Sequence, residues 1–275
     1  MNGDPRTLSA LAQLEACESV LVALSGGVDS AVLLALALKA LDRSRVLAVT
    51  GQSASLTDED LAAAGAVARR LGAEHLVAPT HEIERPGYRA NRGDRCFHCR
   101  WELFGLLRRV ADERGLARVA YGAIVDDLGD HRPGMQAAER LGVVAPLLAA
   151  GIGKPEVRAL ARAAGLPIAE RPANACLASR IPAGSEVTVA RLERIGRAES
   201  ALRALGLGQL RVRDHGRTAR IELDADGLRR IADAGFRGRV VRATRGAGFA
   251  EVVVDPGGYR PGGAGSMPPK RDGGQ

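Results

Sequence analysis

The stretch VLVALSGGVDSAVLLALAL, residues 20–38, decides the fold of this chain. It predicts a short strand, a loop with two adjacent glycines, and an apolar helix from about Ser30. Glycine lets the backbone turn tightly and approach a ligand closely, and the N-terminus of the next helix offers unpaired N–H groups and a positive dipole to an anion. We therefore predict a phosphate cradle formed by Ser25, Gly26, Gly27, Asp29 and Ser30.

The same residues also fit a simpler interpretation of this loop. Many turns between a strand and a helix have an Asp or Ser as the helix N-cap, and Asp29 or Ser30 would serve. No Gly-Lys-Ser/Thr follows, so the loop is not a Walker A motif, and the Rossmann glycine pattern is absent.

Strands and helices alternate along the first half of the chain. Strands are predicted over 20–24, 45–50, 74–78 and 118–122, with a short one in VVAPL (143–147), and helices over 58–71, 97–114 and 154–166. This alternation predicts an α/β fold with a parallel sheet and helices on both faces.

The pattern changes from Thr188 to that of a small α+β unit. A helix over 189–205 precedes strands over 210–216 and 218–223, which form a hairpin turned at His215 and Gly216, and then a helix over 225–245 and a strand over 250–255. We therefore divide the chain into a nucleotide-binding domain (1–170), a cysteine-bearing loop (171–188), a small α+β domain (189–255) and a flexible tail (256–275).

The charge of the chain is unevenly distributed. The net charge is +7, and residues 176–255 hold 15 arginines against 10 acidic side chains. Arginine suits bidentate recognition of phosphate or carboxylate, so a site for an anionic small molecule explains the excess as well as RNA does. With 3% aromatic residues for base stacking, we expect no nucleic-acid partner.

Neither a membrane span nor a secretory signal is expected. The longest apolar run, residues 31–38, is far shorter than a spanning helix requires. The first residues lack a basic segment that leads into an apolar stretch. We expect a cytoplasmic protein without a membrane partner.

Four cysteines are too few for a disulfide framework in a chain of this length. Cys96 and Cys99 form a CxxC at the start of a predicted helix, where two thiols can bind one metal ion or one edge of a cluster. Cys17 lies in an apolar stretch and is expected in the core. Cys176 lies in the long loop between the two domains, which favours a functional thiol.

Several stretches together resemble the LarE family of ATP-dependent sulfur transferases. SGGVDS alone resembles the PP-loop of the ATP pyrophosphatase superfamily. The more specific stretches, with their first residues, are RCFHC (95), YGAIVDDLGDHRPGMQAAERLGVVAPL (121), CLASRIP (176) and LRVRDHGRTARIEL (210). The resemblance implies a PP-loop fold that binds ATP and Mg²⁺, with Asp29 near the metal ion.

The resemblance also implies a reaction. Members adenylate a carboxylate of pyridinium-3,5-biscarboxylic acid mononucleotide, and sulfur then displaces AMP, which gives the thiocarboxylates of the nickel-pincer nucleotide cofactor. In one branch the cysteine that matches Cys176 gives up its own sulfur. In the other, cysteines that match Cys96, Cys99 and Cys176 hold a 4Fe-4S cluster. All three are present here, which favours the cluster branch.

Further site residues follow from position in the chain and from the same resemblance. Asp127, Asp130 and Arg132 come after the fourth predicted strand, where ligands of open α/β sheets bind, and are expected to orient ATP, Mg²⁺ or substrate. Asp127 could instead simply cap the next element. Arg180, four residues after Cys176, is expected near the adenylate. Arg211 and Arg213 on one strand, with Glu222 on its partner, are expected to bind the substrate phosphate at a subunit interface, so a homo-oligomer is expected. An exposed ladder of ion pairs explains the last three residues equally well.

Two other functions fit parts of the sequence. A PP-loop tRNA thiolation enzyme would also combine this loop with cysteines, and a steep salt dependence of tRNA affinity would distinguish it. A nucleotide-binding sensor without catalysis would keep the loop, and its activity would be indifferent to Cys176.

Overall fold

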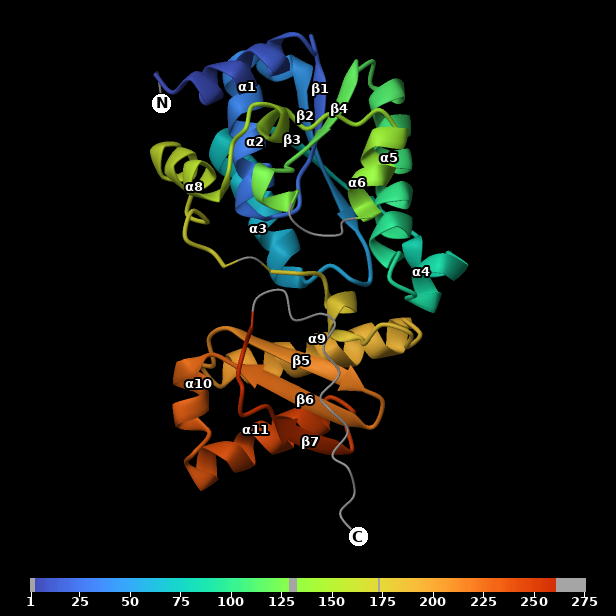
Figure 1. Cartoon of the computed structure of the whole chain (residues 1–275), viewed down its shortest axis with the longest axis vertical. Coiled ribbons are helices and arrows are strands. Elements are labelled where there is room, and N and C mark those ends of the chain that lie inside the picture. The colour runs from blue at the N-terminus through green and yellow to red at the C-terminus, as the bar shows by residue number, and fades with distance from the viewer. Residues whose placement is uncertain (1–2, 129–132, 173, 261–275) are drawn as a thin grey trace. The chain divides into compact units, whose positions relative to one another are not determined.

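The computed structural model describes residues 3–128, 133–172 and 174–260 (Figure 1). The chain divides into two compact units, Met1–Tyr88 with Asp94–Asn174 and Arg89–Gly93 with Ala175–Gln275. The grouping of Arg89–Gly93 with the second unit was not expected from the sequence. The predicted boundaries at 170 and 188 stay predictions, and residues 261–275 of the predicted tail lie outside the described residues.

A four-stranded parallel sheet forms the centre of the first unit. Its order is β3-β2-β1-β4. The strands are β1 (Val20–Ala23), β2 (Val46–Gln52), β3 (Glu74–Pro79) and β4 (Arg118–Tyr121). The predicted parallel α/β fold is confirmed. The predicted strand near 143–147 is reduced to one bridge between Ala120 and Val144, because Pro146 begins helix α7 instead.

Helices cover both faces of this sheet (Figure 1). On one face lie α1 (Pro5–Glu15), α2 (Val28–Ala40), α3 (Asp58–Leu71) and α8 (Lys154–Ala163), packed on Val20 and Val22. On the other face α5 (Arg95–Glu113) and α6 (Pro133–Arg140) pack on Leu21. Alternate strand residues therefore feed two separate cores. The remaining short elements are η1 (Arg43–Arg45), η2 (Glu82–Glu84), α4 (Pro86–Ala90), η3 (Val125–Asp127) and α7 (Pro146–Ala149).

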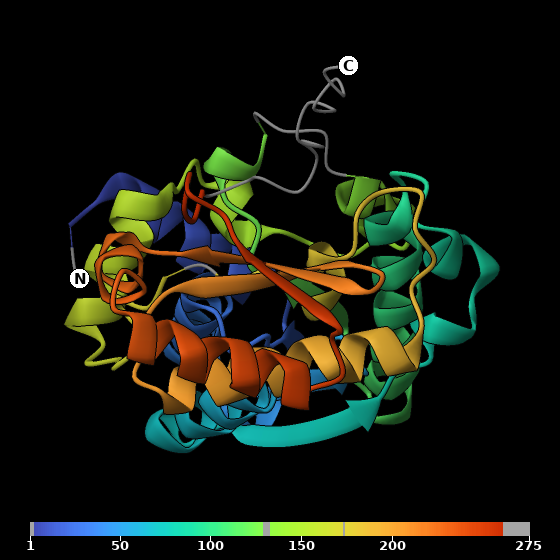
Figure 2. The same cartoon turned by 90° about the horizontal axis from the view of Figure 1, so that it is seen from below.

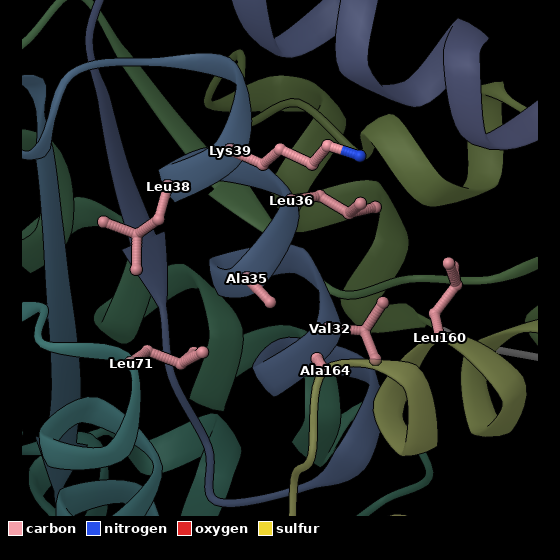
Figure 3. A pocket seen from close by; sticks show the side chains of 8 residues that line it. All are labelled: Val32, Ala35, Leu36, Leu38, Lys39, Leu71, Leu160 and Ala164. Carbon is pink, nitrogen blue, oxygen red and sulfur yellow. The ribbon is translucent and has the colours of Figure 1, made fainter. Parts of the chain in front are cut away.

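An apolar hollow of about 330 Å³ lies beside α2 (Figure 3). Val32, Leu36 and Leu160 line it, and Lys39 lies among its lining residues. Most of these residues belong to the C-terminal half of α2 or to α8, so the hollow is remote from the loop that precedes α2. No helix within the described ranges has the length and apolar character needed to cross a membrane.

The second unit is built on a three-stranded sheet. Strands β5 (Leu210–His215) and β6 (Thr218–Leu223) are antiparallel, and β7 (Glu251–Val254) is parallel to β6. Gly216, at φ +77°, makes the predicted turn of the hairpin. Two helices, α9 (Val189–Ala204) and α11 (Ala234–Gly246), lie side by side on one face of this sheet (Figure 2).

Two helices replace the single one predicted over 225–245. They are α10 (Ala225–Arg230) and α11. The side chain of Asp233 accepts a hydrogen bond from the backbone N–H of Phe236 at 2.6 Å and so caps a new helix. Helix α1 was not among the predicted elements either, although Asp4 caps it and Pro5 is its first residue.

Candidate nucleotide and sulfur site

The glycine loop lies at the switch point of the first sheet. Strand β1 leads through α2 to β2 on one side, whereas β4 lies on its other side and is entered from α5 on the opposite face. Ligands of open α/β sheets bind at such a point, beyond the carboxyl ends of the strands. Gly122, just after β4, approaches the loop closely, since a Cβ there would lie 2.7 Å from the Ser30 nitrogen.

The loop is held in shape by its own residues. Gly26 has φ +76°, a left-handed conformation that favours glycine. The Ser30 hydroxyl accepts a hydrogen bond from the Ser25 backbone N–H at 3.1 Å and donates one to the Gly27 carbonyl at 3.0 Å. Ser30 is buried, so its hydroxyl shapes the loop, and its predicted contact with the nucleotide stays a prediction.

The start of helix α2 is suited to an anion. Gly27 is its N-cap and, lacking a side chain, makes no side-chain cap hydrogen bond. The first N–H groups of α2 can therefore donate hydrogen bonds to a ligand, and the positive end of the helix dipole favours an anion there. Neither Asp29 nor Ser30 caps the helix, so the simpler explanation of this loop as a side-chain-capped turn is wrong.

Asp29 forms an ion pair that the sequence did not indicate. Both of its carboxylate oxygens lie 2.8 Å from the Nζ atom of Lys154, the first residue of α8. Burial raises the pKa of Asp29, and Lys154 acts in the opposite direction. The side chains are 28% and 29% exposed, so a ligand at the loop can reach both. Lys154 thus brings a cation to the predicted phosphate cradle.

Two acidic residues after β4 accept backbone hydrogen bonds near the glycine loop and Lys154. Asp127 accepts a hydrogen bond from the Ile124 backbone N–H at 3.1 Å, and Asp126 accepts one from the Lys154 backbone N–H at 2.8 Å. Asp126 therefore fixes the backbone at the start of α8, of which Lys154 is the first residue. The predicted role of Asp127 in nucleotide binding stays a prediction, and Asp130 and Arg132 lie outside the described residues.

Cys96 and Cys99 lie in the first turn of α5, and neither forms a disulfide within the described residues. Three residues apart on a helix, they face the same side. Within either unit, the described residues include no group of three or more His, Cys, Asp or Glu side chains that could hold a metal ion. Cys176 belongs to the other unit, so a three-cysteine ligand set stays a prediction. Cys17 is buried in the core, as predicted.

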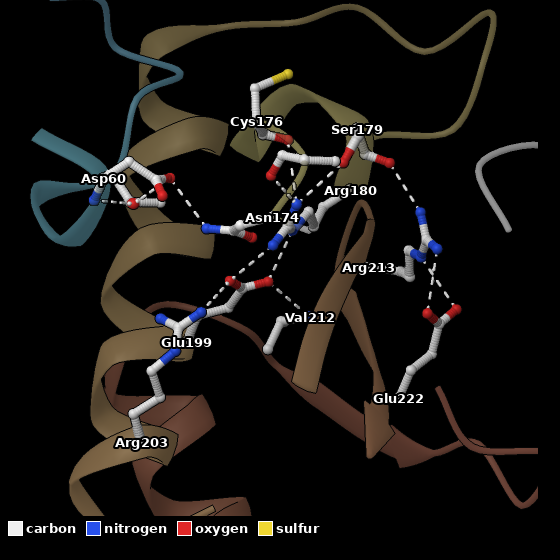
Figure 4. Close-up of polar contacts among 12 residues, drawn as sticks. Asp60, Asn174, Cys176, Ser179, Arg180, Glu199, Arg203, Val212, Arg213 and Glu222 are labelled. Carbon is white, nitrogen blue, oxygen red and sulfur yellow. Dashed lines mark hydrogen bonds and ion pairs between the residues drawn. The ribbon is translucent and has the colours of Figure 1, made fainter. Parts of the chain in front are cut away.

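Cys176 is the N-cap of η4 (Leu177–Arg180) in the second unit, and it is exposed (Figure 4). Arg180 lies beneath it and is 1% exposed. The Arg180 guanidinium makes two hydrogen bonds to Glu199 of α9, at 2.9 and 3.1 Å. It also donates to the carbonyls of Ala175 and Cys176. Arg180 therefore clamps the backbone on which the Cys176 thiol is carried.

This geometry changes the interpretation of Arg180. A guanidinium buried to this degree and bonded to Glu199 and to two carbonyls has little surface left for a nucleotide. The predicted contact between Arg180 and the adenylate stays a prediction, and the observed contacts give Arg180 a role in holding the loop. Glu199 was not predicted, because a Glu inside a helix pattern usually faces solvent.

We expect Glu199→Gln to destabilise the protein by about 3 kcal/mol, because it removes the carboxylate that balances the buried Arg180 charge. Glu193→Gln in the same helix is the matched control. Its ion pair with Arg197 is 3.7 Å long and exposed, so we expect a change of less than about 0.5 kcal/mol. Urea unfolding of both variants measures the difference, and equal stabilities would contradict the clamp.

The polar face of the second sheet carries the other predicted residues. Arg213 makes a two-point ion pair with Glu222, at 3.0 and 3.1 Å, and donates to the Ser179 carbonyl at 2.8 Å (Figure 4). Arg211 faces Glu222 across the strands, but its guanidinium lies over the Tyr259 ring, 4.7 Å from the centroid. Arg211 is 7% exposed, and burial lowers the pKa of its guanidinium. Arg211, Arg213 and Glu222 are all buried, so the alternative of an exposed ladder of ion pairs is wrong, and their predicted contact with the substrate phosphate stays a prediction.

Comparison with known proteins agrees with this geometry. A family model described as NAD synthase matches residues 7–91, which include the glycine loop. Pyridinium-3,5-bisthiocarboxylic acid mononucleotide synthase of Lactiplantibacillus plantarum is 35% identical over 92% of this chain and 91% of its own length. The chain belongs to the LarE family. It is an ATP-dependent enzyme of the LarE type, and the PP-loop implies binding of ATP and Mg²⁺.

Two further relatives match most of the chain. An uncharacterized protein of Synechocystis sp. is 40% identical over 89% of this chain and 91% of the relative. An uncharacterized protein of Methanocaldococcus jannaschii is 26% identical over 86% of this chain and 89% of the relative. Similarity of this extent covers both units of the LarE-type chain, not the nucleotide loop alone.

Proposed function

We propose that this LarE-type enzyme adenylates the carboxylates of pyridinium-3,5-biscarboxylic acid mononucleotide and converts them to thiocarboxylates for a nickel-pincer nucleotide cofactor. The observation that carries the proposal is the nucleotide loop, where an uncapped helix N-terminus, Asp29 and Lys154 meet at the switch point. The identity to a synthase of that name over both units supports the choice of substrate.

The first step is attack of a substrate carboxylate oxygen on the α-phosphorus of ATP. A new P–O bond forms, the bond to the β-phosphate oxygen breaks, and pyrophosphate leaves. In this proposal the N–H groups of the loop hold the β- and γ-phosphates, and the Lys154 ammonium balances charge that develops on the leaving group. The partly exposed Asp29 carboxylate offers oxygen ligands of the kind that Mg²⁺ prefers. Bound Mg²⁺ would neutralise phosphate charge.

The second step replaces AMP by sulfur. AMP is a good leaving group, so a sulfur nucleophile forms a C–S bond to the activated carbonyl as the C–O bond to AMP breaks. The exposed Cys176 is the residue that we assign to this step. In the sacrificial form its thiolate attacks, and loss of the Cα proton with cleavage of the Cβ–S bond leaves dehydroalanine and the thiocarboxylate.

We favour a cluster-bound sulfur in this chain. Cys96 and Cys176 are exposed, Cys99 is partly exposed, and none of the three forms a disulfide within the described residues, which fits ligation of a 4Fe-4S cluster. The cluster would supply a sulfide on the iron that no cysteine ligates. The three cysteines would hold the cluster, and Arg180 would keep the Cys176 backbone in place.

The polar sheet face supplies a site for the phosphate of the substrate. Arg211 has a buried guanidinium with a ring beneath it, and Arg213 is held in a fixed orientation by Glu222. Two oriented guanidinium groups on one strand suit a phosphate monoester. We propose a small-molecule mononucleotide ligand here, in a homo-oligomer, in the cytoplasm and without a nucleic-acid or membrane partner.

The proposal is tested by incubating the anaerobically purified chain with ATP, Mg²⁺, sulfide and the biscarboxylate mononucleotide. We expect one AMP and one pyrophosphate for each oxygen replaced by sulfur, as measured by coupled pyrophosphate detection and mass spectrometry of the product. Nicotinate mononucleotide, with one carboxylate, is the control for substrate specificity. Absence of pyrophosphate release with the biscarboxylate would contradict the proposed reaction.

A further inference from the structure

The Asp60 carboxylate in the first turn of α3 joins two segments that are far apart in the sequence. Asp60 is 7% exposed. Its Oδ1 atom lies 2.9 Å from Nη2 of Arg171. Its Oδ2 atom accepts hydrogen bonds from Thr57 Oγ1 at 2.7 Å and from Asn174 Nδ2 at 3.0 Å, the latter drawn in Figure 4. Thr57 itself caps α3 through the Asp60 N–H. Both carboxylate oxygens are therefore occupied, and the helix start is fixed.

The same group of residues touches the nucleotide loop. Nη1 of Arg171 donates a hydrogen bond to the carbonyl oxygen of Gly26 at 3.0 Å. A Cβ on Gly26 would lie 2.3 Å from the Asp60 carbonyl oxygen, so the loop packs directly on the α3 backbone. Arg171 thus bridges the loop and the Asp60 carboxylate with one guanidinium. A movement of the glycine loop therefore moves Arg171, and with it the Asp60 carboxylate.

The segment that Asp60 holds leads directly to the proposed sulfur site. Asn174 is the last residue of the first unit, and Cys176 follows two residues later. Two residues of extended chain span at most about 7 Å. The hydrogen bond from Asn174 to Asp60 therefore fixes one end of a very short tether.

We propose that Asp60 is a positioning residue, which, with Arg171 and Asn174, ties the start of the Cys176 segment to the nucleotide loop so that sulfur, not water, meets the acyl adenylate. This inference rests on the proposed function. The acyl adenylate has two fates: a sulfur nucleophile displaces AMP and leaves a thio-acyl product, or water displaces AMP and regenerates the carboxylate. The tether favours the first because a misplaced nucleophile loses rate steeply.

The test compares AMP released with thiocarboxylate formed in the full-length enzyme. We expect Asn174→Ala and Asp60→Asn to raise the ratio of AMP to thiocarboxylate about tenfold, with adenylation itself retained. Arg162→Gln is the matched control, because its ion pair with Glu170 in the same unit is exposed, and its ratio should equal that of the unaltered enzyme. A purely structural loss would slow both steps together and leave the ratio unchanged.

The outcomes separate this inference from the proposed function. If the unaltered enzyme makes no thiocarboxylate, the proposed function fails. If it does, and both variants keep its ratio of AMP to thiocarboxylate, whatever their overall rate, the positioning role of Asp60 is overturned. Asn174 is exposed, so Asn174→Ala keeps the test valid even where Asp60→Asn folds poorly.

Discussion

Replacement of Cys176 by Ala is expected to lower thiocarboxylate formation by about a thousandfold or more, because it removes the group that carries or ligates the reactive sulfur. Adenylation should survive, since the nucleotide loop lies in the other unit and its hydrogen bonds do not involve Cys176. We expect a burst of about one pyrophosphate per active site, followed by slow further release as the acyl adenylate hydrolyses. Rapid-quench assays of pyrophosphate and product measure both.

Cys17→Ala and Ser179→Ala are the controls for this experiment. Cys17 is a buried core thiol, and loss of Ser179 Oγ removes one hydrogen bond from Arg180 without touching the thiol. Both should keep most of the thiocarboxylate formation. A Cys176→Ala enzyme that makes product at the normal rate would contradict the assignment and favour a nucleotide sensor or a different sulfur carrier.

The same residue distinguishes the two sulfur sources. Mass spectrometry of Cys176 after turnover should show an intact cysteine when a cluster carries the sulfur. A loss of about 34 Da, one hydrogen sulfide, would mark conversion to dehydroalanine and exclude a catalytic cluster there, because that residue cannot ligate iron. Iron and sulfide analysis of anaerobically purified protein provides the complementary measurement.

The nucleotide loop was predictable from sequence because its information is local. A strand, two adjacent glycines and an apolar helix follow one another within twenty residues, and the period of the hydrophobic residues fixes each element. The parallel sheet followed from repeated alternation of the same kind. Local capping chemistry decided the errors: Asp233 splits the predicted helix 225–245, and Pro146 begins a helix where a strand was predicted.

The partners of the site residues were not predictable, because they come from distant segments. Lys154 follows Asp29 by 125 residues and reads as an ordinary first helical residue. Glu199 reads as a polar helix position, yet it is fully buried against Arg180. Hydrophobic periodicity predicts which face of a helix is buried, but not which charged residue of another segment lies against it. Without the knowledge that Glu199 pairs with it, Arg180 was predicted to bind the adenylate. The position of Lys154, directly after Gly153 at the start of a predicted helix, is the weak signal that could have suggested it.

Replacement of Lys154 by Met should lower kcat/KM for ATP in the adenylation step by about a hundredfold to a thousandfold. Its ammonium stands 2.8 Å from both Asp29 oxygens, at the edge of the loop. Charge on the departing pyrophosphate grows in the transition state, so removal of a nearby cation should lower kcat as well as raise KM. Lys39→Met is the matched control, since Lys39 lies at the far end of α2 beside the apolar hollow.

Stability measurements separate this loss from unfolding. The ion pair of Asp29 with Lys154 is partly exposed, so its removal should change the free energy of unfolding by only about 1 kcal/mol. Asp29→Asn removes the same pair but leaves the ammonium free for phosphate, so its defect should be smaller in excess Mg²⁺ than that of Lys154→Met. If Lys154→Met keeps the kcat/KM of the unaltered enzyme, Lys154 only anchors Asp29, and the loop alone carries the charge of the leaving pyrophosphate.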